Sequence, residues 1–240
     1  MENESNGVKL WENGPFWATC NLGAEKPQDG GRYFWWGDIG GSVWKKGKMF
    51  GGDWIDAQGN KHIFDDDTTP SREAEEPCPI LGRSVNNVLQ FLAFRHVWLE
   101  KFTLTKKNDA AACLLGGSWH MPTSQDLNNL IRKCEWKWDQ VEGVTGYTVQ
   151  GRGDFATASI FLPAAGYGSD NALFDFGKVG FYWSSSEFLT DTVSPLQRSL
   201  GLGGGLAGLA FHLRFGKGND YHVSHAGRCG GGTIRAIREA

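Results

Sequence analysis

The end of the chain lacks several amino-acid types that the rest of it uses freely. Residues 198–232 contain no Glu, Gln, Met or Trp, and their one Lys is Lys217. They consist largely of Gly, Leu, Ala, His, Arg and Ser, with Asp, Tyr and Cys among the others. The residues before position 198 use all of the missing types. Two explanations fit this bias.

The first explanation lies in the codons. An Asn codon that is randomised at its adenines can encode Gly, Leu, Ala, His, Arg, Ser, Asp, Tyr or Cys, but never Glu, Gln, Lys, Met or Trp. The segment therefore has the composition that adenine-directed mutagenesis of Asn codons would give to a diversified ligand-contact surface. The second explanation is a glycine-rich surface loop whose composition has drifted.

Other absences exclude whole classes of protein. The formal net charge is −3. The chain therefore lacks the excess of positive charge that would indicate a nucleic-acid partner. No apolar run approaches the roughly 18 residues that a membrane-spanning helix needs, and the polar segment Met1–Lys9 is not typical of a signal peptide. The cysteines form no C-x-x-C pair, which argues against a structural zinc site, and their spacing predicts free thiols. They are Cys20, Cys78, Cys113, Cys134 and Cys229.

Tryptophan and glycine, by contrast, are abundant, with 11 and 34 copies. Helical patterns are few, so this mixture predicts a single loop-rich α+β domain over residues 1–240, in which large aromatic rings fix irregular segments. Residues 39–79 are polar and rich in Gly, Asp and Pro, and we expect them to form an insertion in that domain. The side chains expected in the core are Trp17, Trp119, Phe161, Leu162, Trp183, Leu213, Phe215 and Ile234.

Two short helices are predicted. Asp109–Leu115 should form one that ends at Gly116-Gly117, and a second should begin after Thr123 or Ser124 and run to about Cys134. Residues 84–101 fit either a helix or an extended segment. Strands and a hairpin are predicted at 16–20, 136–150, 158–163, 180–186, 210–215 and 233–238. In the last of these, alternation places Arg235 and Arg238 on a polar face.

Seven short stretches also occur in a fixed order along nearly the whole chain. They are NGPFWATCNLGA from Asn13, YFWWGD from Tyr33, DAA with GGSWHMPT and CEW from Asp109, GVTGYTVQGRG from Gly143, ASIFLPAAGY from Ala158, GFYWSSS from Gly180 and TIRAIR from Thr233. As an ordered set they resemble a family abundant in gut Bacteroidetes and their phages. The resemblance implies a C-type lectin fold, distantly similar to formylglycine-generating enzymes, in which the first and last strands pair. Here those strands are Phe16–Cys20 and Thr233–Arg238.

Many members of this family are variable proteins of diversity-generating retroelements, whose C-terminal strands and loops carry a randomised ligand-binding surface. The resemblance therefore implies a ligand-binding protein with a variable region at 198–230, a protein or cell-surface ligand, a place on a cell surface or phage particle, and no cofactor. The stretch Arg198–Leu209 departs from the family pattern because it is more apolar and richer in glycine. The ligand-binding positions would be Arg198, Leu200, Leu202, Phe211, His212, Arg214, Gly216, Gly218, Asp220, Tyr221, His222, Ser224, His225, Ala226, Cys229 and Gly230.

A variable surface makes a specific structural prediction. Leu213 and Phe215 should point inward, because neighbours in a strand alternate sides. The polar, aromatic and Cys side chains around them should be exposed and gathered on one face. These are His212, Arg214, Asp220, Tyr221, His222, His225 and Cys229.

Three alternatives to a diversified ligand-binding protein are compatible with parts of the sequence. A surface or adhesion module of the same fold without diversification is the first. An enzyme similar to the formylglycine-generating enzymes is the second, but the closely spaced cysteine pair that binds copper in those enzymes is missing, and we expect no catalytic residues. The third is a metal site, at His212, His222 and His225 or at Asp65-Asp66-Asp67. Solvated histidines and an acidic turn explain these residues without a metal.

Overall fold

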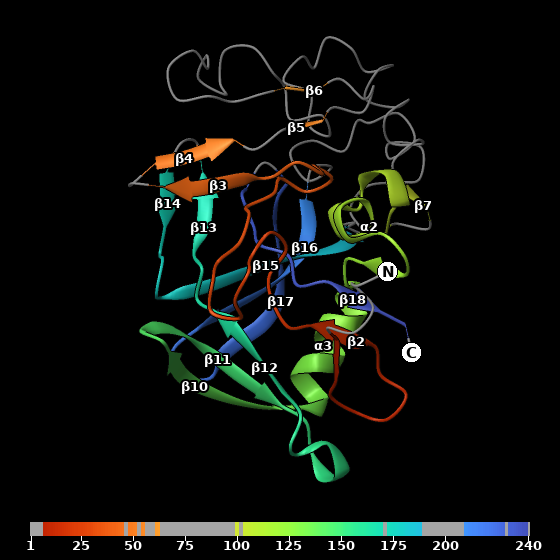
Figure 1. Ribbon diagram of the computed structural model, residues 1–240, viewed down its shortest axis with the longest axis vertical. Helices are drawn as coiled ribbons and strands as arrows, with labels where there is room; N and C mark the ends of the chain where they lie inside the picture. Colours follow the sequence, from red (N-terminus) through yellow and green to blue (C-terminus); the bar gives the residue numbers. More distant parts are fainter. Residues whose placement is uncertain are drawn as a thin grey trace.

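The computed structural model describes residues 7–45, 48–51, 54–55, 61–62, 99–100, 103–169, 172–188, 209–228 and 230–239. This part of the chain is mostly β-sheet, with long irregular connections and two α-helices (Figure 1). It is therefore an α+β protein, as predicted. The acidic turn at 65–67, the segment 84–98 and most of the predicted insertion at 39–79 lie outside the described residues.

The two ends of the described chain meet in one sheet. Its strand order is β1-β2-β18-β9, where β1 is Gly7–Lys9, β2 is Phe16–Ala18, β18 is Ile237–Arg238 and β9 is Trp119–His120. In antiparallel register Ile237 lies opposite Trp17, and Arg238 lies opposite Phe16. The predicted pairing of the first and last strands is confirmed.

A five-stranded antiparallel sheet crosses the middle of the molecule, in the order β17-β16-β15-β8-β7. The register of β15 against β16 shifts between Trp183 and Glu187, where β15 bulges. Beyond β17 this sheet has no further strand among the described residues. The strands are β7 Leu99–Glu100, β8 Thr103–Leu104, β15 Val179–Glu187, β16 Leu209–Gly216 and β17 Asp220–Gly227.

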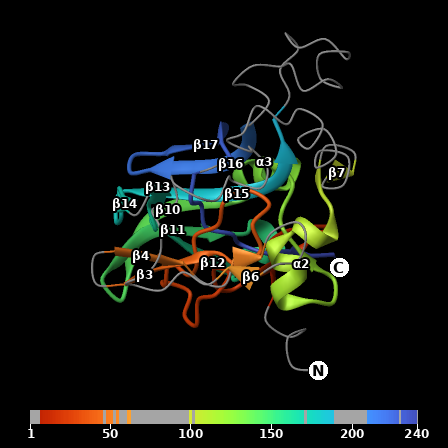
Figure 2. The ribbon, with the colours of Figure 1, turned by 90° about the horizontal axis from the view of Figure 1, so that it is seen from above.

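Smaller sheets complete the fold. The predicted hairpin is formed by β10 and β11, which turn at Glu142-Gly143, and β12 extends it to three strands. In Figure 2 this three-stranded sheet lies beside the layer of β15, β16 and β17. The strands are β10 Glu135–Val141, β11 Val144–Gln150 and β12 Ser159–Pro163, with two-stranded pairs β3 Ser42–Lys45 and β4 Lys48–Gly51, β5 Trp54–Ile55 and β6 Lys61–His62, and β13 Tyr167–Ser169 and β14 Ala172–Phe174. Short 3₁₀ turns lie at Lys106–Asn108 and Gly153–Phe155.

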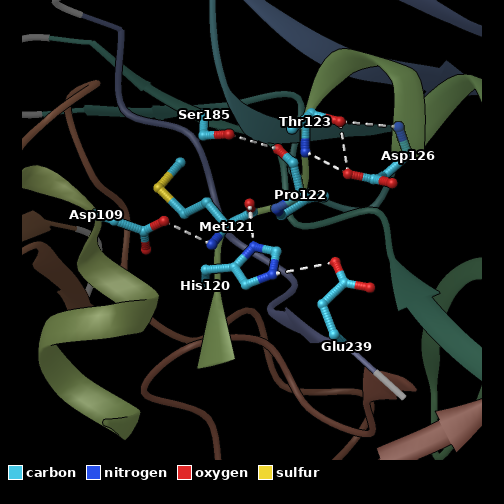
Figure 3. Close-up of polar contacts among 8 residues, drawn as sticks. All are labelled: Asp109, His120, Met121, Pro122, Thr123, Asp126, Ser185 and Glu239. Carbon is cyan, nitrogen blue, oxygen red and sulfur yellow. Dashed lines mark hydrogen bonds and ion pairs between the residues drawn. The ribbon is translucent and has the colours of Figure 1, made fainter. Parts of the chain in front are cut away.

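Both predicted helices are present, and both begin at side-chain caps. The Asp109 carboxylate accepts from Ala112 N, 2.9 Å away, at the start of α2 (Ala110–Leu115). The same carboxylate accepts from Met121 N at 2.8 Å, so it also ties the helix to the residue that directly follows β9 (Figure 3). Helix α3 (Ser124–Lys133) opens with a capping box between Thr123 and Asp126.

The core consists of two hydrophobic clusters, and strand β15 contributes to both. Phe181 and Trp183 belong to the first cluster, and Tyr182 belongs to the second together with Leu213 and Phe215. All eight side chains that were predicted to be in the core are buried. A Cβ at Gly180 would lie 2.0 Å from the Phe215 ring, so this close approach of ring to backbone requires glycine. The five-stranded sheet is thus covered on both faces near β15.

One prediction about the last segment is wrong. Arg235 was expected on a polar face, but its side chain is completely buried. Its guanidinium donates to four oxygens: Asn21 Oδ1 at 3.0 Å, Ala18 O at 3.1 Å, Thr19 O at 2.9 Å and Phe161 O at 2.8 Å. Burial lowers the pKa of Arg235. The cation is stabilised by carbonyl dipoles that the sequence gives no means of locating.

Candidate functional site

The hairpin β16–β17 presents a polar cluster on one face of the five-stranded sheet. Arg214 lies opposite His222 in the register of the two strands, and Asp220 is two residues from His222 on the same side. Arg214 Nη1 lies 3.3 Å from Asp220 Oδ2, and His222 Nδ1 lies 3.3 Å from Asp220 Oδ1. The three side chains are 41%, 53% and 49% exposed. We call Arg214, Asp220 and His222 the polar cluster.

The other face of the same hairpin is packed against the interior. Leu213 and Phe215 are buried there, as predicted. Tyr221 was expected to be exposed on the same face as the polar cluster, and it is not. Its ring stacks on Trp136, with centroids 4.8 Å apart, and lies edge-on to Tyr147 at 5.5 Å. The reason is strand alternation, which forces Tyr221 to the side opposite Asp220 and His222.

His212 also departs from the prediction, because it is only 3% exposed. It points to the same face as Arg214, but there the Phe181 ring stacks on it at 3.9 Å and Trp183 lies edge-on at 5.8 Å. Burial, reinforced by the charges of His222 and Arg214, lowers the pKa of His212 to about 3. Its Nδ1 atom has no hydrogen-bond partner among the described residues. His212 is therefore a neutral core residue at neutral pH.

The remaining predicted positions are divided among several environments. Phe211 and His225 share the face of Leu213, where both pack on Phe188, His225 stacking at 3.8 Å. His225 is nevertheless exposed, whereas Ser224 and Ala226, on the face of the polar cluster, are half-buried. Gly216 is buried, Gly218 is exposed at the turn and Gly230 is half-buried. Outside the described residues lie Arg198, Leu200, Leu202 and Cys229.

A buried ion pair fixes the far end of the hairpin. Arg228 Nη2 donates to Glu187 Oε1, and Arg228 Nε donates to Leu209 O at 3.2 Å. The guanidinium also lies over the Trp36 ring, 4.4 Å from its centroid. Glu187 ends β15, Leu209 begins β16 and Arg228 directly follows β17, so one side chain joins the ends of three strands. We call Arg228 and Glu187 the strand clamp.

An aromatic row that the sequence did not predict leads towards the polar cluster. Phe174 stacks on Tyr167 at 5.7 Å, and Tyr167 lies 6.1 Å from Phe181, which stacks on His212. Phe174 is 44% exposed, whereas Phe181 is buried. The sequence offered one signal, the closely spaced Phe174 and Phe176 on either side of Asp175. Only the pairing of β13 with β14 shows which of the two rings joins the row.

The three histidines considered as metal ligands, His212, His222 and His225, do not all lie on one face of the hairpin. His212 and His222 point to one face of the hairpin, whereas His225 points to the other. No group of three or more His, Cys, Asp or Glu side chains that could hold a metal ion occurs in the described ranges. Cys20, Cys113 and Cys134 are free thiols. None of the helices within those ranges is long and apolar enough to cross a membrane.

Comparison of the chain with family models, with curated proteins and with solved structures gave no match.

Proposed function

We propose that this chain is a ligand-binding protein in which a C-type lectin scaffold displays a diversified C-terminal surface to a protein or cell-surface ligand. The proposed activity is binding rather than catalysis. The polar cluster forms part of the contact surface, and the strand clamp and the core hold that surface in place.

Three features of the fold support the proposed scaffold. Strand β2 pairs with the last strand, β18, and the irregular segments are anchored by buried aromatic rings. The two helices precede β15, β16 and β17, and the last two of these strands carry the polar cluster. The family resemblance of the sequence motifs implies the same arrangement. A C-type lectin fold need not mean a sugar ligand, because function resides in the site and not in the fold.

The observation that carries the proposal is the separation of exposed and buried side chains within one hairpin. The side chains of Arg214 and His222 are 41% and 49% exposed, while Leu213 and Phe215, which alternate with Arg214 along β16, are buried in the core. Substitutions at exposed positions usually change stability by about 0.5 kcal/mol or less. A surface of this kind can change its side chains, and so its ligand, without losing the fold that holds it.

The first prediction tests this separation. Replacing Arg214, Asp220 and His222 together with Asn should leave the melting temperature within about 4 °C of the parent. Peptides enriched from a random dodecapeptide phage library on the immobilised triple variant should differ from those enriched on the parent. Leu213→Asn is the matched control, because it places an amide in the core and should lower the melting temperature sharply.

Each outcome has a definite meaning. Unfolding of the triple variant would show that the polar cluster is structural, and identical peptide sets would show that it is not a contact surface. Either result would remove the main support for the proposed function.

A genomic observation separates diversified proteins from adhesion modules of fixed sequence. A near-identical repeat close to the gene, with Asn codons at the variable positions and a neighbouring reverse transcriptase gene, supports diversification. A locus without them favours the fixed module.

A further inference from the structure

The aromatic row of Phe174, Tyr167 and Phe181 ends in an exposed ring, and exposed apolar side chains are few on the described surface. Among the described residues only three large apolar side chains are exposed, namely Leu114, Phe174 and Phe176. Of these three side chains, Phe174 is the one that belongs to a series of ring contacts. Its ring contacts Tyr167, which contacts Phe181 on the face that carries the polar cluster. Exposed aromatic rings beside polar groups are typical of the residues that contribute most of the energy of protein interfaces.

The row is also rigidly held. After Phe174 the chain turns through Asp175 and Gly177, which have φ values of 52° and 74°. Gly177 N donates to Ala164 O at 2.8 Å, and Thr145 Oγ1 donates to Gly177 O at 2.6 Å. One face of the Phe174 ring is already covered by Tyr167. A partner that packs on the exposed part of Phe174 therefore loses little free energy to ordering this surface.

The hydrogen-bond donors next to the row point to a partner that carries a carboxylate. Arg214 lies opposite Phe181 in the register of β15 and β16, so its side chain shares the face of that ring. A guanidinium has five N–H donors, and one of those of Arg214 is hydrogen-bonded within the described part of the chain, to Asp220. The remaining donors match the two oxygens of a carboxylate.

We propose that Phe174 and Tyr167 form a fixed aromatic anchor beside the polar cluster, and that the ligand is a protein segment with an aromatic or large aliphatic side chain next to a carboxylate. The apolar side chain packs on Phe174, and the carboxylate binds Arg214. This inference rests on the proposed function, and it divides the surface into an anchor outside the variable region and a specificity-determining part within it.

The test uses the peptides enriched on the parent protein from the random dodecapeptide phage library. These peptides should pair an aromatic or large aliphatic residue with Asp or Glu. The dissociation constant of a synthetic peptide of this kind is then measured by fluorescence anisotropy against Phe174→Ser, Arg214→Gln and Phe176→Ser. Phe176 is the matched control, because it is 55% exposed, lies two residues from Phe174 and has no ring contact among the described residues.

We expect Phe174→Ser and Arg214→Gln each to weaken binding by about tenfold or more, and Phe176→Ser to leave it within about twofold. Phe174→Tyr should keep most of the affinity, which separates loss of the ring from loss of folding. The melting temperature of each variant checks the fold independently.

Four results would overturn the anchor. Weakening by Arg214→Gln but not by Phe174→Ser would reject it while leaving the proposed function in place. Equal weakening by Phe174→Ser and Phe176→Ser would reveal non-specific adsorption to exposed rings. Insensitivity to all three substitutions, or no enrichment over a surface coated with an unrelated protein, would reject the anchor and the proposed function together.

Discussion

At the scale of single residues, the informative cases are polar side chains that the fold buries. His212 and Arg235 are both almost inaccessible, but they reach this state in opposite ways. The Arg235 guanidinium is surrounded by four oxygen acceptors, whereas His212 packs against the Phe181 and Trp183 rings. Arg235 therefore stays charged in the core, and His212 stays neutral.

His212 should make the protein sensitive to acid. Its pKa falls from an ordinary value of 6.5 to about 3 in the folded chain. Between these values the unfolded chain takes up a proton that the folded chain does not, so the free energy of unfolding falls as the pH is lowered. The contribution of His212 is at most about 1.4 kcal/mol per pH unit. His212→Gln should therefore lose stability less steeply than the parent between pH 6.5 and pH 4.

Urea unfolding at a series of pH values measures this slope. His120→Gln is the control, because it removes a histidine that does not contribute to the lowered pKa of His212. Parallel slopes for the parent and His212→Gln would contradict the burial of His212.

Arg235 should not be replaceable by lysine. An ammonium keeps the charge, but it has three donors at one point and cannot reach four oxygens arranged around a planar guanidinium. We expect Arg235→Lys to lower the free energy of unfolding by about 3 kcal/mol or more, because buried acceptors lose charged hydrogen bonds. Chemical denaturation measures the loss.

Arg152→Lys is the matched control for this substitution. Arg152 is exposed and pairs with Glu135 at 3.8 Å, so its replacement should change stability by less than about 1 kcal/mol. Equal effects of the two substitutions would mean that the Arg235 hydrogen bonds contribute little.

At the scale of strands and helices, the strand clamp holds the ends of β15, β16 and β17 together, and it should contribute strongly to stability. Arg228→Ala removes the cation that pairs with the buried Glu187 carboxylate, which should cost about 3–5 kcal/mol. The double variant Glu187→Leu with Arg228→Met removes both charges and should be clearly more stable than Arg228→Ala. Thermal unfolding of the parent and both variants measures the difference. A double variant no more stable than Arg228→Ala would show that the charges are not the source of the cost.

The elements with strong local signals are those that the sequence predicted. Helix α3 was evident from its cap at Thr123 and from the spacing of Leu127 and Leu130, and β16 was evident from its alternation. The position of an isolated polar residue was not predictable in the same way. The burial of His212 depends on Phe181, and that of Arg235 depends on Phe161, both of which lie far away along the chain.

The candidate site was predictable only where local sequence patterns determine it. Composition and motifs pointed to the hairpin that carries the polar cluster, and alternation gave the inward direction of Leu213 and Phe215. Neither could show that Tyr221 packs on Trp136. The contact of Phe174 with Tyr167 arises from the pairing of β13 with β14, two strands that the sequence did not predict.

At the scale of the whole molecule, the last residues complete the fold. Ile234, Arg235, Ala236 and Ile237 are all buried, and β18 lies between β2 and β9. A chain that stops at Thr233 should therefore lose its cooperative thermal transition. A chain that stops at Arg238 should keep it, because Glu239 is 79% exposed. Circular dichroism melting of the two chains tests this, and a cooperative transition in the shorter one would contradict it.

The position of β18 beside β2 also determines the side of the protein from which a fused stalk would leave. Figures 1 and 2 show the C-terminal end on the right and the turn end of the β16–β17 hairpin on the left. A stalk fused after the C-terminal end thus leaves from the side opposite that turn. Several copies on one carrier would all point their hairpins outward, and multivalent attachment would multiply a weak individual affinity through a high effective concentration.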